Sequence, residues 1–91
     1  SLILDMTTNL SRIGNFTLNK NYEKANYFAD ELEKYIKELN TREYDKRLTS
    51  WIDKTEKIIK ELRTENFNNK DIAEDSFTSG IVLQNRVIYL L

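Results

Sequence analysis

The sequence predicts an all-α fold, an up-down four-helix bundle with a short first helix, built as a single domain over residues 1–91. Apolar residues recur at alternating intervals of three and four, which is the repeat of helices that pack at a shallow angle. The chain has no proline and only two glycines, whereas strand-and-turn folds need more turn-forming residues. We therefore expect no β-sheet. With 40% hydrophobic residues the chain can form one small core.

The first helix is expected over residues 2–13. Its apolar positions are Leu2, Ile3, Leu4, Met6, Leu10 and Ile13. Gly14 and Asn15 both tolerate the left-handed conformation that ends many helices, so the helix should stop there. Only Asp5 and Arg12 are charged in this segment, which indicates a helix that is more buried than amphipathic.

The second helix is expected over residues 19–39 and has the cleanest periodicity. Its apolar positions are Leu18, Tyr22, Ala25, Ala29, Leu32, Ile36 and Leu39. Thr17 or Asn19 could cap its N-terminus, because both side chains accept hydrogen bonds from exposed backbone N–H groups. Charged residues fill the other positions, which is typical of a solvent-exposed back.

The third helix is expected over residues 42–66. Its apolar positions are Tyr44, Leu48, Trp51, Thr55, Ile58 and Leu62. This pattern is out of register with that of the second helix. In one continuous helix the two apolar stripes would face different directions and could not both be buried. A tight helical hairpin resolves this, with Asn40 ending one helix and Thr41 capping the next; a capping box from Asn40 to Glu43 is the alternative. We expect Trp51 to be largely buried.

The fourth helix is expected over residues 70–91, capped by Asn68 and Asn69. Its expected core face consists of Ala73, Phe77, Gly80, Ile81, Val87, Ile88 and Leu91, and Ile72, Leu83 and Leu90 widen it to about half the circumference. Gln84 falls at the centre of that face, where we interpret it as a buried amide that fixes register, with ligand binding as the alternative. Gly80 indicates the close approach of another helix, with Trp51 or Tyr22 as the suggested neighbours.

Composition restricts the classes of function. The net charge of −1 argues against nucleic acid and anionic membranes as partners. The absence of cysteine excludes cysteine nucleophiles and thiolate metal sites, and the absence of histidine removes the commonest general base and metal ligand, so we expect no cofactor and no metal site. No apolar run is long enough to span a bilayer. The cytoplasm is the expected location.

A small second patch lies away from the expected core of the last helix. It contains Val82, Arg86 and Tyr89, and aromatic residues and arginine are enriched at interfaces. Helices one and four also lack the heavily charged back of helices two and three. We therefore predict a homodimer or a hetero-complex through helices one and four, with these three residues as the partner-binding centre.

The expected function is that of a non-catalytic protein–protein interaction module, such as an adaptor, an antitoxin or immunity-type protein, or a regulatory subunit. The alternative is a small enzyme or small-molecule-binding bundle with an aromatic-lined pocket. That pocket would be lined by Tyr22, Tyr35, Trp51 and Arg86, together with carboxylates. No catalytic residue is predicted.

Overall fold

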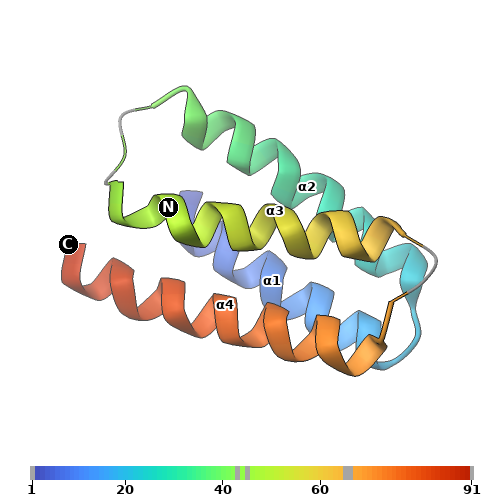
Figure 1. The fold of residues 1–91 in the computed structure, drawn as a ribbon. Coiled ribbons are helices and arrows are strands. Elements are labelled where there is room, and N and C mark those ends of the chain that lie inside the picture. The colour runs from blue at the N-terminus through green and yellow to red at the C-terminus, as the bar shows by residue number, and fades with distance from the viewer. Residues whose placement is uncertain (1, 43, 45, 65–66, 91) are drawn as a thin grey trace.

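The structure, a computed structural model, describes residues 2–42, 44, 46–64 and 67–90, with side chains described as far as Asn85. The α-helices are α1 (Leu2–Leu18), α2 (Tyr22–Asn40), α3 (Thr49–Arg63) and α4 (Asn69–Leu90), with a 3₁₀ turn η1 (Lys46–Leu48) before α3. They run alternately up and down as a bundle (Figure 1). The described residues contain no strand, so the predicted all-α four-helix bundle is confirmed.

The helices differ in how closely they approach one another. α1 packs most extensively against α4 and α2, whereas α3 lies over the bundle with fewer backbone contacts (Figure 1). Small buried residues, including Gly14 on α1, Ala25 and Ala29 on α2 and Gly80 on α4, allow the close approaches. The buried side chains of α3 are larger: Leu48 just before it, then Trp51, Ile52, Ile58, Ile59 and Leu62. Bulky side chains hold helix axes further apart.

Trp51 is the central aromatic residue of the core. It is only 2% exposed, as predicted, and it packs within a cluster that includes residues of all four helices. Its indole Nε1–H donates a hydrogen bond to the backbone oxygen of Ser79 on α4, at 2.9 Å. The polar edge of the ring is therefore satisfied while its apolar body is buried.

The predicted end of the first helix is wrong. α1 continues through Gly14 and Asn15 to Leu18, which gives it 17 residues rather than a short span. Continuation is favoured because it buries Gly14 and Thr17 within the bundle. The left-handed residue is Lys20, with a φ of 58°, and it makes the turn into α2.

The predicted caps of the second helix are also wrong. Asn21 is the N-cap, and its side chain accepts a hydrogen bond from the backbone N–H of Lys24 at 3.3 Å. Thr17 is buried within α1, and Asn19 lies in the turn. Leu18 and Tyr22, expected in the core, are 49% and 39% exposed because they flank this turn.

The second connection is longer than the predicted tight hairpin. Asn40 is the last residue of α2, but Thr41 caps that helix by donating its backbone N–H to Glu38, so it does not begin the next one. α3 starts only at Thr49 and ends at Arg63. The predicted end of this helix at residue 66 is also wrong, because Thr64 is already extended and caps α3. The alternative capping box involves residue 43, which lies outside the described residues.

The start of α4 agrees with the prediction, since the side chain of Asn68 accepts hydrogen bonds from the backbone N–H groups of Lys70 and Asp71. Its predicted core face is wrong in part. Gln84 is exposed, so the buried-amide interpretation fails, and Ile81 is 60% exposed. The face that is buried comprises the predicted Ile72, Ala73, Gly80 and Leu83 together with Ser76 and Ser79.

The observed buried face of α4 is rotated by roughly 80° about the helix axis from the predicted one, at 100° per residue. This rotation turns small residues towards α1, which lies too close for larger ones. Gly80 does face another helix, but a Cβ there would meet Thr7 and Leu10 of α1 at 3.7 Å, rather than Trp51 or Tyr22. The predicted core residues beyond position 85 fall outside the described side chains.

Candidate functional site

The α1–α4 seam face is the solvent side of the junction between these two antiparallel helices. Thr7 and Gly14 of α1 contact α4, at Gly80 and Phe77 respectively. Leu4, Ser11 and Leu18 form the next stripe outwards on α1, because residues seven apart share a helix face. On α4 the corresponding stripe extends from Phe77. The seam face is defined here by Leu4, Ser11, Leu18, Phe77, Ile81 and Gln84.

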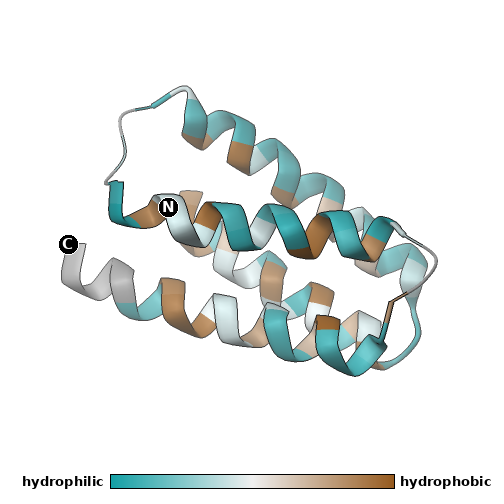
Figure 2. Cartoon of the chain, viewed as in Figure 1, coloured by the Kyte–Doolittle hydropathy of each residue, from teal (hydrophilic) through white to brown (hydrophobic). Residues whose placement is uncertain are grey.

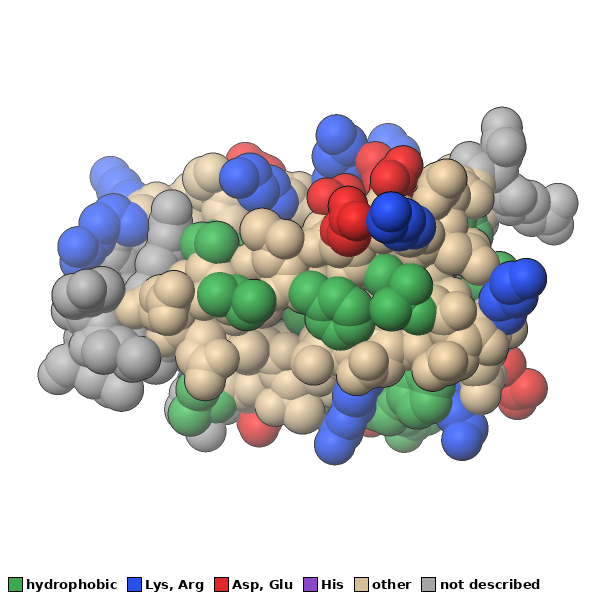
Figure 3. All heavy atoms as spheres, turned by 90° about the horizontal axis from the view of Figure 1, so that it is seen from below, with side chains coloured by type: hydrophobic (Ala, Val, Ile, Leu, Met, Phe, Trp, Pro, Cys, Tyr) green, Lys and Arg blue, Asp and Glu red, His purple; other side chains and the backbone are tan. Residues whose placement is uncertain are grey.

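Large apolar side chains are exposed on the seam face. Leu4 is 44% exposed, Leu18 49% and Ile81 60%, while Phe77 is half-buried. Figure 3, which views the molecule from below Figure 1, shows hydrophobic side chains in a row along this side of the bundle. The first turns of α4 are hydrophilic and its middle is apolar or neutral (Figure 2). A contiguous apolar row is more informative than single exposed apolar residues.

The seam face is also almost free of charge. No residue from Ser76 to Asn85 is charged, and α1 has only Asp5 and Arg12. Arg12 belongs to another side of α1, because its guanidinium carbon lies 5.0 Å from the centroid of the Phe28 ring on α2. Charged side chains border the apolar row (Figure 3). Because this surface is apolar and nearly uncharged, it can be desolvated by a partner at little cost.

The predicted partner-binding residues lie elsewhere on α4. Val82 is 38% exposed and lines a groove of about 260 Å³ between α3 and α4, together with Trp51, Lys54 and Asp75. Ile81 and Val82 thus occupy different sides of α4. Arg86 and Tyr89 fall on the part of α4 whose side chains are outside the described residues. The predicted set stays a prediction.

Sequence reasoning missed Leu4, Leu18 and Ile81 as surface residues because it assigned all three to the core. One signal could have identified them: α1 and α4 contain more apolar residues than a single buried stripe can hold, so some must be exposed. Ile81 follows a run of small residues. A helix that packs closely on those small residues leaves the large side chain beside them exposed to solvent. Which stripe faces the neighbour depends on helix rotation, which periodicity alone does not fix.

The residues of the alternative aromatic pocket do not converge. Tyr22 lies near the start of α2, where its hydroxyl accepts a hydrogen bond from Asn69 at 2.6 Å and its ring meets Phe67 edge-on. Trp51 faces α4 and lines a different groove. Tyr35 is half-buried against the core, and the side chain of Arg86 is outside the described residues.

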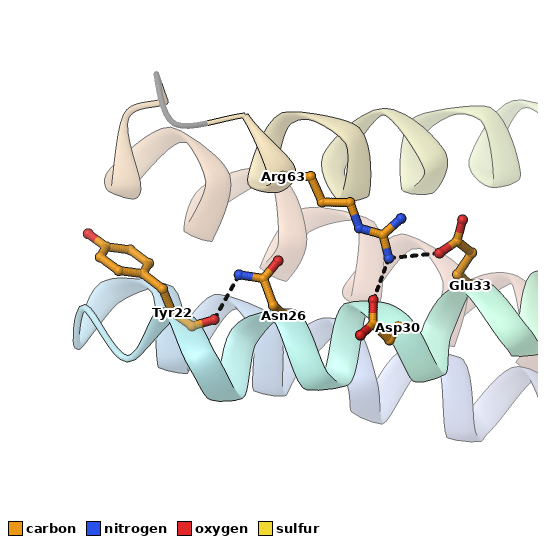
Figure 4. Close-up of polar contacts among 5 residues, drawn as sticks. All are labelled: Tyr22, Asn26, Asp30, Glu33 and Arg63. Atoms are coloured by element: carbon orange, nitrogen blue, oxygen red, sulfur yellow. Dashed lines mark hydrogen bonds and ion pairs between the residues drawn. The ribbon is translucent and has the colours of Figure 1, made fainter.

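An ion-pair cluster joins α2 to α3 (Figure 4). Nη2 of Arg63 lies 2.5 Å from Asp30 and 2.7 Å from Glu33. The hydrogen bond from Arg63 lowers the pKa of Glu33 and raises the pKa of Arg63. Hollows of about 430 and 450 Å³ flank Arg63. Because its guanidinium is already neutralised by two carboxylates, the cluster is better suited to holding α3 against α2 than to capturing an anion.

A second cluster holds α1 to α2. The Phe16 and Phe28 rings stack with centroids 5.6 Å apart, and Tyr27 meets Phe28 edge-on at 5.1 Å. Lys24 lies over Phe16, with 5.4 Å between its ammonium and the ring centroid. A hydrogen bond to Glu31 raises the pKa of the Tyr27 hydroxyl. The cluster therefore joins α1 to α2, while Tyr27 stays 57% exposed and lines, with Phe16 and Phe28, a shallow hollow of about 660 Å³.

Comparisons with protein-family models, curated proteins and solved structures found no match. Within the described ranges, no three metal-binding side chains lie close enough together to hold an ion. Nor does any helix in those ranges have both the length and the apolar character needed to cross a membrane. The exposed surface of the bundle is therefore the main indication of its function.

Proposed function

We propose that this chain is a non-catalytic protein–protein interaction module that binds its partner through the α1–α4 seam face. One observation carries the proposal: Ile81, which is 60% exposed, stands in a ten-residue stretch of α4 without a charged side chain, on the same side of the bundle as the exposed Leu4 and Leu18 of α1. Contiguous apolar patches with a polar border are typical of interaction sites. Adaptors, antitoxins, immunity proteins and regulatory subunits fit this description equally, because fold does not select among them.

The energetics favour a partner that covers the whole face. Fully burying a leucine or isoleucine contributes about 1.5–3 kcal/mol, so completing the burial of three half-exposed side chains contributes roughly 3 kcal/mol in all. Association costs at least about 4 kcal/mol in lost translational and rotational freedom. The partner must therefore also contact Phe77 and the neutral polar residues of the face. A folded protein surface provides such an area, whereas a small molecule does not.

The predicted patch of Val82, Arg86 and Tyr89 is the competing location for the same function. Of its three residues, Val82 lines the α3–α4 groove together with Lys54 and Asp75. The α3–α4 groove, at about 260 Å³, is smaller than most ligand pockets, about 300–1,000 Å³, whereas the two hollows beside Arg63 fall within that range. The cytoplasm remains the predicted location of this interaction module.

Two adjacent substitutions decide between the surfaces. Ile81→Lys places a charge on the seam face, and Val82→Lys places the same charge on the groove side of the same helix turn. Each tagged variant is used to capture partners from an extract of the source organism, with Asn40→Lys, at an exposed position of α2 away from both surfaces, as a control of the same added charge. We expect Ile81→Lys alone to lose a partner that wild type and the other two variants retain. Loss with Val82→Lys alone assigns binding to the predicted patch, and retention by all variants rules out both surfaces.

A further inference from the structure

We infer that the partner on the α1–α4 seam face is a second copy of this chain, related by a two-fold axis that crosses α1 and α4 at the level of Ser11. This inference rests on the proposed function, since it names the occupant of the same surface. Three observations support it: the symmetric placement of apolar side chains about Ser11, the neutrality of the face, and its size.

The apolar side chains of α1 are symmetric about Ser11. Leu4 lies seven residues before Ser11 and Leu18 lies seven after it, about 10 Å away in each direction at 1.5 Å per residue. A two-fold axis through Ser11 places a second α1 antiparallel to the first. Leu4 then meets Leu18 of the second copy, and the reverse contact forms as well. Ser11 is small and exposed, so the two helices can approach at the axis.

The apolar side chains of α4 follow the same symmetry. Phe77 lies against Gly14, three residues beyond Ser11, whereas Gly80 lies against Thr7 and Leu10, on the other side of it. Phe77 and Ile81 therefore lie on opposite sides of the level of Ser11. The same axis brings Phe77 against Ile81 of the second copy. An isologous contact requires this kind of self-complementary surface.

Charge also favours a second copy. Two identical surfaces bring like charges together near a two-fold axis, and like charges opposed across an interface cost several kcal/mol. The seam face avoids this, because its six defining residues are uncharged and Arg12 is turned towards α2. An unlike partner is commonly selected by complementary charge. The seam face offers little charge for such selection, because its charged neighbours on α4, Lys70 and Glu74, lie at one end of it, seven residues before Phe77 and Ile81.

The size of the face is adequate for a reversible dimer. The 17 residues of α1 span about 25 Å, and two helices side by side are about 20 Å wide, which gives about 500 Å² in projection. A standard interface removes about 800 Å² of accessible surface per partner, and the accessible surface of a corrugated face exceeds its projection. The face is therefore large enough for a reversible dimer.

Sedimentation equilibrium of the full chain tests the inference, because charges at a two-fold axis meet their own copies. Ser11→Lys and Ser11→Glu each oppose two like charges, and both should weaken dimerisation at least tenfold, or about 1.4 kcal/mol. An equimolar mixture of the two variants should restore association through unlike charges. Likewise, Leu4→Lys with Leu18→Glu in one chain should dimerise more tightly than Leu4→Lys with Leu18→Lys, although both lose the apolar contact of the leucines. Circular dichroism confirms that each variant is folded.

Several outcomes overturn the inference. A wild type that remains monomeric at high micromolar concentration excludes the dimer, and a dimer that is unchanged in both Ser11 variants has its contact elsewhere. If both variants dissociate but their mixture does not associate, the axis does not pass near Ser11. The proposed function is tested separately. If wild type is monomeric but Ile81→Lys loses a natural partner, the seam face is a binding site for another protein, and only the inferred second copy is excluded.

Discussion

The two glycines of this chain should respond in opposite ways to the same substitution. Both lie inside helices, where alanine is favoured over glycine by about 1 kcal/mol. At Gly80 an added Cβ would have its nearest neighbours at 3.7, 3.7 and 3.9 Å, which are ordinary contacts. Gly80→Ala should therefore raise the free energy of unfolding by about 0.5–1 kcal/mol. For a domain of this size that is a rise in Tm of about 3–6 °C.

At Gly14 the added Cβ would lie 2.6 Å from Cε1 of Phe77, 2.8 Å from Cζ and 3.0 Å from Cδ1. The ring must move by about 1 Å, and overpacking of this kind costs about 1–3 kcal/mol. Phe77 is half-buried and can shift towards solvent, so the cost should be near the middle of that range. After the gain in helix propensity of about 1 kcal/mol, Gly14→Ala should be about 1 kcal/mol less stable than wild type.

Urea denaturation at a concentration where the chain is monomeric measures both effects. A double-mutant cycle with Phe77→Ala isolates the clash, because Gly14→Ala should become stabilising once the ring is absent. A coupling energy of about 2 kcal/mol between the two positions is expected from the two preceding estimates. If Gly14→Ala stabilises the wild-type chain as much as Gly80→Ala does, Phe77 does not pack on Gly14. The assigned contact between α1 and α4 is then wrong.

Two further predictions concern α3. Trp51→Ala should lower the free energy of unfolding by about 3–5 kcal/mol, a large part of a total of roughly 5–10 kcal/mol; a loss below about 1 kcal/mol in urea melts would place the indole outside the core. Arg63 lowers the pKa of Glu33 in the folded state, so the stabilising effect of this pair is present above the ordinary value of 4.5 and is lost as the pH falls through the folded pKa. Between neutral pH and pH about 3, wild type should therefore lose more stability than Glu33→Gln, by a few tenths of a kcal/mol for so exposed a pair. Equal losses in thermal melts would mean that the ion pair contributes nothing.

Local sequence determined the number and type of the helices. The three–four periodicity of α2 and α3 matches a buried stripe on each, and the residues predicted for it at Ala25, Ala29, Leu32, Trp51 and Ile58 are all buried. Asn68 caps α4 as expected, because a cap needs only a short polar side chain and the next few backbone N–H groups. These features depend on residues within a few positions of one another, and sequence displays them directly.

The tertiary structure decided where α1 ends and how α4 is rotated. Gly14 carries a local stop signal, yet the helix continues because Phe77 of a distant segment covers the glycine. In α4 several stripes are apolar enough to be buried, and the close approach of α1 selects the one with small residues. That choice exposes Ile81 and creates the proposed binding face. Contacts between segments far apart in the chain fix both outcomes, so propensity and periodicity within one helix could not.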